Sequence, residues 1–131
     1  MSQSVKSATR VFKTAWFSKA PKKALVSDKE LCEAIRQLLA GQSDDLGGGV
    51  FKKRLNRNMH RSIVLAKGRR YWIYVFLFAK KDRQNIGDDE LIEFRKLAGL
   101  YAAKTEEDFT RELELKELLE ICHGHETQVQ D

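Results

Sequence analysis

Two clusters of cationic and amide side chains have the clearest capacity for chemistry. The first consists of Lys52, Lys53, Arg54, Arg57, His60 and Arg61. The second follows the apolar stretch Tyr71–Ala79 and consists of Lys80, Lys81, Arg83 and Asn85, with Asp82 among them. Such clusters suit RNA phosphates, because each phosphate that is neutralised releases condensed counterions. The alternative is a solvated sheet rim whose lysines protect an edge against aggregation. The residues alone leave both interpretations open.

The side chains of the first cluster differ in what they could do. Arginine offers phosphate oxygens a bidentate fork. An imidazole ordinarily titrates near neutrality, so His60 could remove the proton of a 2′-hydroxyl or protonate a leaving oxygen in an RNA-cleaving site. The other interpretation of His60 is an exposed histidine in a turn.

Other chemistries find little support in the sequence. Cys122, His123 and His125 supply metal-binding atoms from one segment only, whereas a zinc site usually needs four ligands from two segments. The glycines at 47–49 lack the Lys-Ser/Thr ending of a phosphate-binding P-loop. No motif for covalent catalysis occurs. We therefore expect no metal and no cofactor.

The distribution of charge supports a polyanionic ligand. The chain has 131 residues and a net charge of +5, which suits one domain. From Val50 to Arg83 there are eleven Lys or Arg residues and one acid, whereas residues 84–131 contain five Lys or Arg and thirteen acids. The basic middle predicts a face for a polyanion, and the acidic region predicts an element that opposes it.

Location and thiol state are also predicted. The longest apolar run, Tyr71–Ala79, is too short to span a membrane as a helix, and the first ten residues lack the apolar core of a secretory signal. Cys32 and Cys122 lie far apart in the sequence. We therefore expect a cytoplasmic protein that has reduced, free thiols and does not bind membranes.

The elements that position these residues follow from periodicity. We expect strands at the segment beginning near Arg10 and at 50–55, 62–67 and 70–79, with a tight hairpin between the last two. Alternation in the last strand puts Tyr71, Ile73, Val75 and Leu77 on one face and Trp72, Tyr74, Phe76 and Phe78 on the other. Since both faces are apolar, this strand should be central.

Helices are predicted on either side of these strands. Ser27 and Glu30 form a capping box before a helix that Gly41 ends, and Asp88 begins another helix after the second cluster. The segment 42–49 is expected to be a loop. Thr105 is expected to cap a further helix, and the apolar positions from Phe109 to Ile121 predict a helical or irregular segment that packs loosely. The fold class is α+β, with a small, mainly antiparallel sheet.

Several segments together resemble the RelE/ParE superfamily of bacterial toxins, and most of all its HigB-like RelE branch. The segments are "RVFKTAWF", "LCEAIRQLLAG", "DLGGGVFKKRL", "HRSIVLA" and "FAKKDRQNIGDDELIEFRKLA". The resemblance implies a RelE-like fold, a mixed sheet flanked by N-terminal and C-terminal helices, over residues 9–121. Residues 1–8 are then a disordered N-terminus and residues 122–131 a flexible tail.

The resemblance also implies a function. RelE-like members are toxins of type II toxin–antitoxin systems that cleave mRNA on the ribosome without metal, by attack of the 2′-hydroxyl on the adjacent phosphate. The implied catalytic residues are Lys53, Arg61 and Lys80, with His60 in place of a tyrosine of the usual loop. The implied RNA-binding residues are Lys52, Arg54, Arg57, Lys81, Arg83 and Asn85.

Partners follow from the same resemblance. They are a HigA-like helix-turn-helix antitoxin, the ribosome and its mRNA, and operator DNA for the toxin–antitoxin complex only. The chain departs from the family pattern in its short loop "NRNMHR" and in lacking a C-terminal catalytic tyrosine or histidine in an evident strand, which leaves the general acid and base open. Two alternatives stay open as well: a ParE-like inhibitor of DNA gyrase, and a nucleic-acid-binding module without catalysis.

Overall fold

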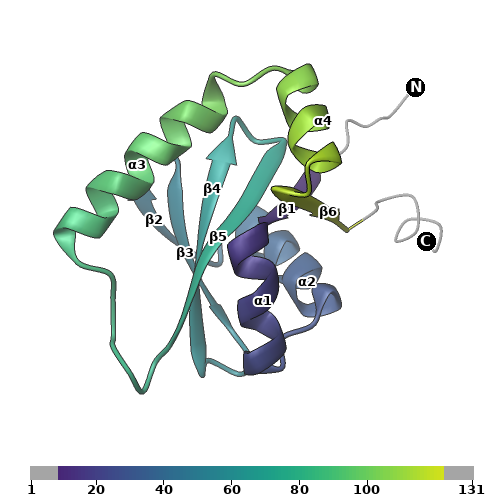
Figure 1. Ribbon diagram of the computed structural model, residues 1–131. Helices are drawn as coiled ribbons and strands as arrows, with labels where there is room; N and C mark the ends of the chain where they lie inside the picture. Colours follow the sequence, from purple (N-terminus) through teal and green to yellow (C-terminus); the bar gives the residue numbers. More distant parts are fainter. Residues whose placement is uncertain (1–8, 123–131) are drawn as a thin grey trace.

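A six-stranded mixed sheet with helices on both faces forms the protein (Figure 1). The computed structural model describes residues 9–122, except for the side chains of residues 21–24. The elements are β1 (Arg10–Thr14), α1 (Ala15–Ala24), α2 (Asp28–Leu39), β2 (Asp44–Gly47), β3 (Val50–Leu55), β4 (His60–Lys67), β5 (Tyr71–Ala79), α3 (Asp88–Ala102), α4 (Glu106–Glu114) and β6 (Leu118–Ile121). The strand order is β2-β3-β4-β5-β1-β6, with β1 and β5 parallel and the other neighbours antiparallel. The predicted α+β class is confirmed.

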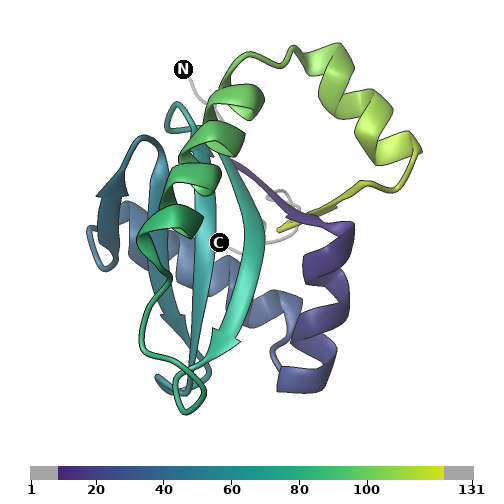
Figure 2. The ribbon, with the colours of Figure 1, turned by 60° about the vertical axis from the view of Figure 1, so that its left-hand side comes forward.

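Each face of the sheet has its own hydrophobic core, with α2 and α3 on opposite sides of the sheet (Figure 2). On the face that we call the α2 face, Phe17 of α1 and Leu31 of α2 share one core with Trp72 of β5. On the opposite face, the α3 face, Tyr101 of α3 and Phe109 of α4 pack in the second core. Successive side chains of a strand point to opposite faces of the sheet, so the side chain of each strand residue near these cores lies on either the α2 face or the α3 face.

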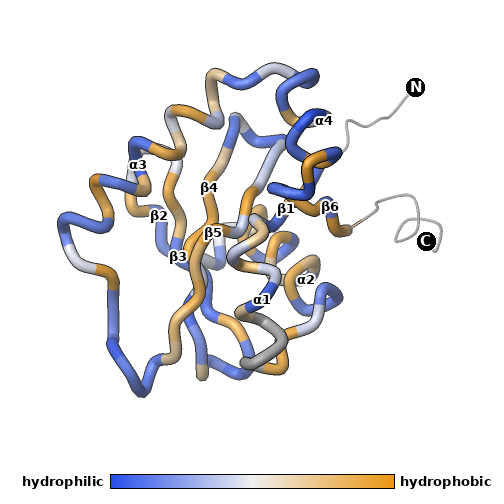
Figure 3. The backbone as a smooth tube through the Cα atoms, viewed as in Figure 1, coloured by the Kyte–Doolittle hydropathy of each residue, from blue (hydrophilic) through white to orange (hydrophobic). Residues whose placement is uncertain are grey.

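Strand β5 is central, as predicted, because β4 and β1 flank it. The predicted alternation is wrong beyond Val75, however. Ile63 of β4 pairs with Phe76 and Val64 pairs with Tyr74, so Val75 is an extra residue in a β-bulge. Phe78 therefore points to the α3 face rather than joining Trp72 and Tyr74. Figure 3 shows the apolar β5 leading into the hydrophilic segment before α3.

Strand β1 covers only the first half of β5. Its pairing with β5 ends at Lys13 and Tyr74. The chain then turns into α1 at Ala15, so residues 75–79 have no strand beside them on that edge. This free half-edge lies next to the second cationic cluster.

The start of α2 confirms one half of the predicted capping box and corrects the other. The Ser27 hydroxyl accepts a hydrogen bond from the Glu30 amide at 3.1 Å. The Glu30 carboxylate does not return to Ser27. It accepts a hydrogen bond from the Asn56 amide at the far end of β3. The side chain that sequence assigns to a local cap thus makes a tertiary contact.

The predicted loop at 42–49 is wrong in part, because Asp44–Gly47 forms the edge strand β2. Gly48, with a φ of 66°, lies under the side chain of Arg95 from α3. A Cβ at Gly48 would lie 2.8 Å from the Arg95 Cγ, so only glycine fits here without displacement. The glycines at 47–49 therefore leave room for the Arg95 side chain of α3.

The C-terminal part is more regular than predicted. Thr105 caps α4 in a reciprocal box with Asp108, which confirms the predicted cap. Leu118–Ile121 is then a strand that pairs with β1, and Leu118 is only 1% exposed. The prediction of a loosely packed segment is wrong, because pairing with β1 satisfies the backbone and buries both ends of β6.

The prediction of free thiols is also wrong. Cys32 in α2 and Cys122 after β6 form a disulfide with a Cα–Cα distance of 5.4 Å. The bond links residues 90 positions apart and ties the last described residue to the α2 layer. His123 and His125, considered above with Cys122 as metal ligands, lie outside the described residues.

We expect the disulfide to raise the stability of the fold. Closing so long a loop restricts the unfolded chain, which corresponds to roughly 2–4 kcal/mol. Reduction, or the Cys32→Ala/Cys122→Ala double substitution, should lower the unfolding midpoint accordingly. Titration of the denatured protein should detect two thiols only after reduction. Two thiols without reduction would contradict the bond.

Candidate nucleic-acid interface

The fold divides the predicted cationic residues between two faces and one end of the sheet. Lys52, Arg54 and Arg61 project from the α3 face, by alternation from Val50 and Ile63 in the core of that face. Lys53 and His60 project from the α2 face. Lys80, Lys81, Arg83 and Asn85 lie in the segment between β5 and α3 (Figure 1). The first cluster is therefore two groups of residues rather than one.

Arg61 is the most unusual of these residues, because it is only 8% exposed. Its Nη1 donates to the Asn58 carbonyl at 3.0 Å and, more weakly, to the His60 carbonyl at 3.4 Å. Within the described part of the chain no carboxylate pairs with it. A desolvated cation without a counter-charge is costly unless an anion completes it. The arrangement therefore favours an anionic ligand at this guanidinium.

Arg54 places a second guanidinium beside the first. It is directly opposite Arg61 in the β3–β4 ladder, and Arg61 is in turn opposite Phe78 of β5. Like charges directly opposite each other on a sheet repel. Arg54 is exposed and has no ion pair among the described residues, whereas its neighbour Lys52 lies 3.6 Å from the Asp44 carboxylate. An anion between Arg54 and Arg61 would relieve the repulsion.

The β3–β4 turn that carries these arginines is strained. Asn56, Arg57 and Asn58 have φ values of 53°, 53° and 71°, a left-handed conformation that suits asparagine better than arginine. Glu30 holds the Asn56 amide, and Arg61 holds the Asn58 carbonyl. Strain of this kind persists where surrounding contacts determine the geometry, and it is common at functional sites. Arg57 projects from the turn into solvent.

In the segment before α3, Arg83 is held by an ion pair, whereas the side chains of Lys80 and Lys81 are exposed. Arg83 pairs with Glu90 of α3 and lies 5.4 Å from the Phe78 ring centroid, and this pairing raises the pKa of Arg83. Asn85 accepts a hydrogen bond from Arg83 through its carbonyl. Lys80 and Lys81 are exposed, and Lys80 donates through its backbone amide to the Met59 carbonyl at 2.8 Å. The backbone of Lys80 is thereby fixed beside the β3–β4 turn, and its exposed ammonium has no ion pair within residues 9–122.

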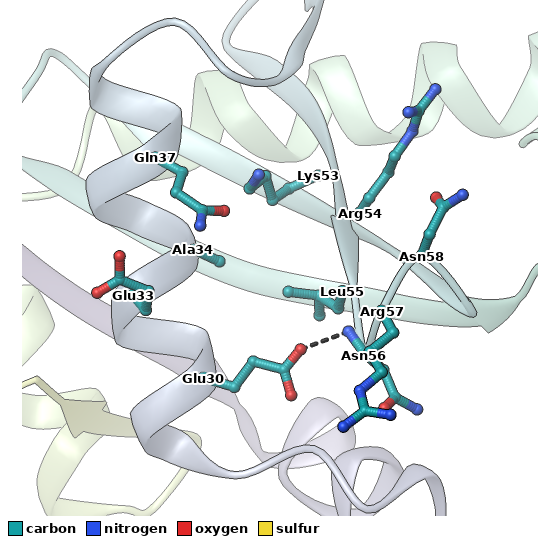
Figure 4. Close-up of a pocket in the computed structure, with 10 residues that line it drawn as sticks. All are labelled: Glu30, Glu33, Ala34, Gln37, Lys53, Arg54, Leu55, Asn56, Arg57 and Asn58. Atoms are coloured by element: carbon teal, nitrogen blue, oxygen red, sulfur yellow. Dashed lines mark hydrogen bonds between the residues drawn. The ribbon is translucent and has the colours of Figure 1, made fainter.

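Lys53 lies in a separate pocket between β3 and α2, shown in Figure 4. It is 7% exposed, and no ion pair or hydrogen bond holds its ammonium among the described residues. Glu33 and Gln37 of α2 line the same pocket, and Arg54 points away from it in Figure 4. Burial, and next the charge of Arg54, lower the pKa of Lys53. Lys53 therefore does not share a ligand site with Arg61.

His60 lies in a cleft at the free half-edge of β5. Trp16 and Lys19 of α1 line this cleft together with His60, Ala79 and Arg83. The Asn56 side-chain amide lies 3.1 Å from His60 Nδ1. If the amide donates this bond, the proton of neutral His60 is on Nε2. Trp16 had no assigned role in the sequence, and Glu30 was assigned only to a helix cap, because their partners in space come from distant segments.

Residues 9–122 contain no group of three or more His, Cys, Asp or Glu side chains arranged to hold a metal ion. None of the helices within that range has the length and apolar character needed to cross a membrane.

Replacement of Lys53 by methionine should stabilise the protein by about 1 kcal/mol at pH 7, because it removes a buried charge that has no partner among the described residues. The folded state holds the pKa of Lys53 below its ordinary value of 10.5, so the unfolded chain binds more protons between the two values. The stability of the wild type should therefore rise with pH through this window, and the advantage of Lys53→Met should shrink.

Chemical denaturation at pH 7 and near pH 10 measures both effects. Lys81→Met, on the exposed segment, should change stability by less than about 0.5 kcal/mol. A destabilised Lys53→Met variant, or a gain that does not depend on pH, would contradict the account of Lys53.

Comparison with known proteins agrees with this architecture. A family model described as the RelE toxin of the RelE / RelB toxin-antitoxin system matches residues 9–121. Comparisons with curated proteins and with solved structures gave no match. The matched range contains all six strands and four helices, which is most of the chain. The chain therefore belongs to the RelE toxin family.

Proposed function

We propose that this toxin is a ribosome-dependent mRNA endonuclease that inhibits translation without a metal ion. The observation that carries the proposal is Arg61, a buried guanidinium that no carboxylate of residues 9–122 pairs with, directly beside the exposed Arg54. Planar guanidinium groups suit the oxygens of a phosphodiester, and a low-dielectric position strengthens the attraction. The RelE family match supports mRNA as the class of substrate.

In the proposed reaction the substrate supplies its own nucleophile. The 2′-oxygen of one nucleotide forms a bond to the adjacent phosphorus, and the bond from phosphorus to the 5′-oxygen of the next nucleotide breaks. The products are a 2′,3′-cyclic phosphate and a 5′-hydroxyl. Arg54 and Arg61 stabilise the negative charge that develops on the phosphoryl oxygens, and Lys80 adds a third cation from the end of β5.

We assign proton donation to His60. As an imidazolium, His60 can transfer its Nε2 proton to the departing 5′-oxygen and become neutral, while the Asn56 side-chain amide lies 3.1 Å from Nδ1. The proton of the 2′-hydroxyl passes to solvent water. Among the residues that the structure describes, His60 is the only imidazole. Positive charge or hydrogen bonds along the RNA backbone come from five further residues: Lys52, Arg57, Lys81, Arg83 and Asn85. Lys53 lies on the opposite face, so it adds to the positive electrostatic potential without contacting the same phosphate.

A nucleic-acid-binding module without catalysis is the second candidate. It is favoured by the opposite directions of Arg61 and His60, which project from different faces of β4. In this alternative the arginines bind RNA, but no proton donor reaches the leaving oxygen. Cleavage by the wild type separates the two candidates.

The proposed partners follow from the family. A toxin of a toxin–antitoxin system has a cognate antitoxin, for which we propose a HigA-like helix-turn-helix protein. The complex would bind operator DNA, whereas the toxin alone would act on ribosomes in the cytoplasm. We also propose that the chain belongs to the HigB-like branch of the family.

Expression of the wild type should produce new mRNA 5′ ends on translating ribosomes. Arg61→Ala should reduce the cleavage rate by about 10²–10³-fold, because it removes a preorganised charge at the reacting phosphate. Lys80→Ala should have a smaller effect, about tenfold, since Lys80 is exposed. Mapping of 5′ ends in cells that express each variant measures these losses.

The matched control is Lys96→Ala, which removes an exposed lysine of α3 that pairs with Glu93. It should cleave as the wild type does. Intact mRNA with the wild type, or equal cleavage by wild type and Arg61→Ala, would overturn the catalytic assignment.

A further inference from the structure

We propose that Trp16 stacks on a nucleobase of the bound RNA strand, next to the phosphate held by Arg54 and Arg61. The inference rests on the proposed function and assigns a positioning role to a residue of α1. It concerns the cleft at the free half-edge of β5, which lies beside the phosphate site and is lined in part by His60 and Arg83.

Trp16 combines exposure with an ordered ring. The residue is 52% exposed, although a large aromatic side chain is usually buried. Its ring stacks on Phe76, with the centroids 5.3 Å apart and an interplanar angle of 26°. Phe76 also contacts the rings of Phe78 and Phe94, and these contacts hold it in place. One face of the indole is thus supported by protein, and the remaining surface is open to a planar partner.

The fold produces this position in a specific way. β1 pairs with β5 only as far as Tyr74, and α1 begins at Ala15. Trp16 therefore follows directly after the point where β5 loses its neighbour, and its ring reaches Phe76 at the uncovered edge. The β-bulge at Val75 turns Phe76 and Phe78 toward the α3 face, which also carries Arg61.

The charges around the cleft favour nucleic acid over an apolar partner. Lys19, His60 and Arg83 line it, with Asp82 as the single acid among its lining residues. Lys80 follows immediately after Ala79. Proteins that bind single-stranded nucleic acid combine cations for the backbone with exposed aromatic rings for the bases. The cleft has both components.

The ring is also close enough to the phosphate site for one strand to contact both. Arg61 is opposite Phe78 in the β4–β5 ladder, and neighbouring strands are about 4.8 Å apart. Trp16 lies beyond the next edge of β5. A short single strand that lies across the end of the sheet can therefore place a phosphate on Arg61 and a base on Trp16.

Intrinsic fluorescence can test the stacking directly. Trp16 and Trp72 are the two tryptophans of the chain, and Trp72 is 1% exposed in the core. A short single-stranded RNA, made uncleavable by 2′-O-methyl groups, should quench the emission of the full-length wild type. Trp16→Phe should lose the quenching and keep most of the affinity, because a base can stack on phenylalanine as well.

Affinity gives the second readout. Fluorescence anisotropy of the labelled RNA should show about tenfold weaker binding for Trp16→Ala. In cleavage assays this variant should raise KM more than it lowers kcat. Leu100→Ala, at an exposed apolar position of α3, is the matched control and should bind as the wild type does.

The outcomes separate this inference from the proposed function. Equal RNA affinity of the wild type and Trp16→Ala, or quenching that persists in Trp16→Phe, would overturn the role of Trp16. Loss of antitoxin binding in Trp16→Ala with intact RNA affinity would also overturn it. If the wild type binds RNA and is quenched but does not cleave mRNA, the catalytic proposal fails and the stacking stands.

Discussion

The burial of β5 on both faces is the constraint on which the rest of the structure depends. A shift of this strand by one residue would move each side chain into the opposite core, which is packed around side chains of other shapes. Its register with β4 is therefore fixed, which sets Arg61 opposite Phe78 near the end of the sheet. The same strand ends at Ala79, so Lys80 emerges at that end. The cations of the site thus occupy positions that the core determines.

Several features of the site lower the stability of the folded protein, and a bound anion would offset them. Arg61 is desolvated with no carboxylate partner in the described part of the chain, Arg54 repels it from the next strand, and three residues of the β3–β4 turn are left-handed. Contacts from Glu30 and from the Lys80 amide hold this turn in place. Each feature alone is tolerable in a small domain. Their concentration at one end of the sheet is typical of a preorganised anion site.

Local patterns predicted much of this architecture, whereas contacts between distant segments did not follow from them. The bounds Val50–Leu55 and the Ser27 cap of α2 follow from periodicity and capping residues, which depend on near neighbours. β2 was missed because acidic residues and glycine are rare in strands and β3 alone supplies its pairing. The bulge at Val75, the Glu30 contact with Asn56 and the Cys32–Cys122 bond are tertiary features. For the same reason the cations were predicted, but their division between two faces was not.

The central claim is that Arg61 is completed by a phosphate anion of RNA. The most direct measurement is a crystal structure of the full chain soaked with a ribonucleoside 3′-monophosphate. The account predicts phosphate oxygens within hydrogen-bond distance of the Arg61 and Arg54 guanidinium groups, with the Asn58 carbonyl still bound to Arg61. A phosphate bound elsewhere, with Arg61 contacting only protein carbonyls, would contradict it.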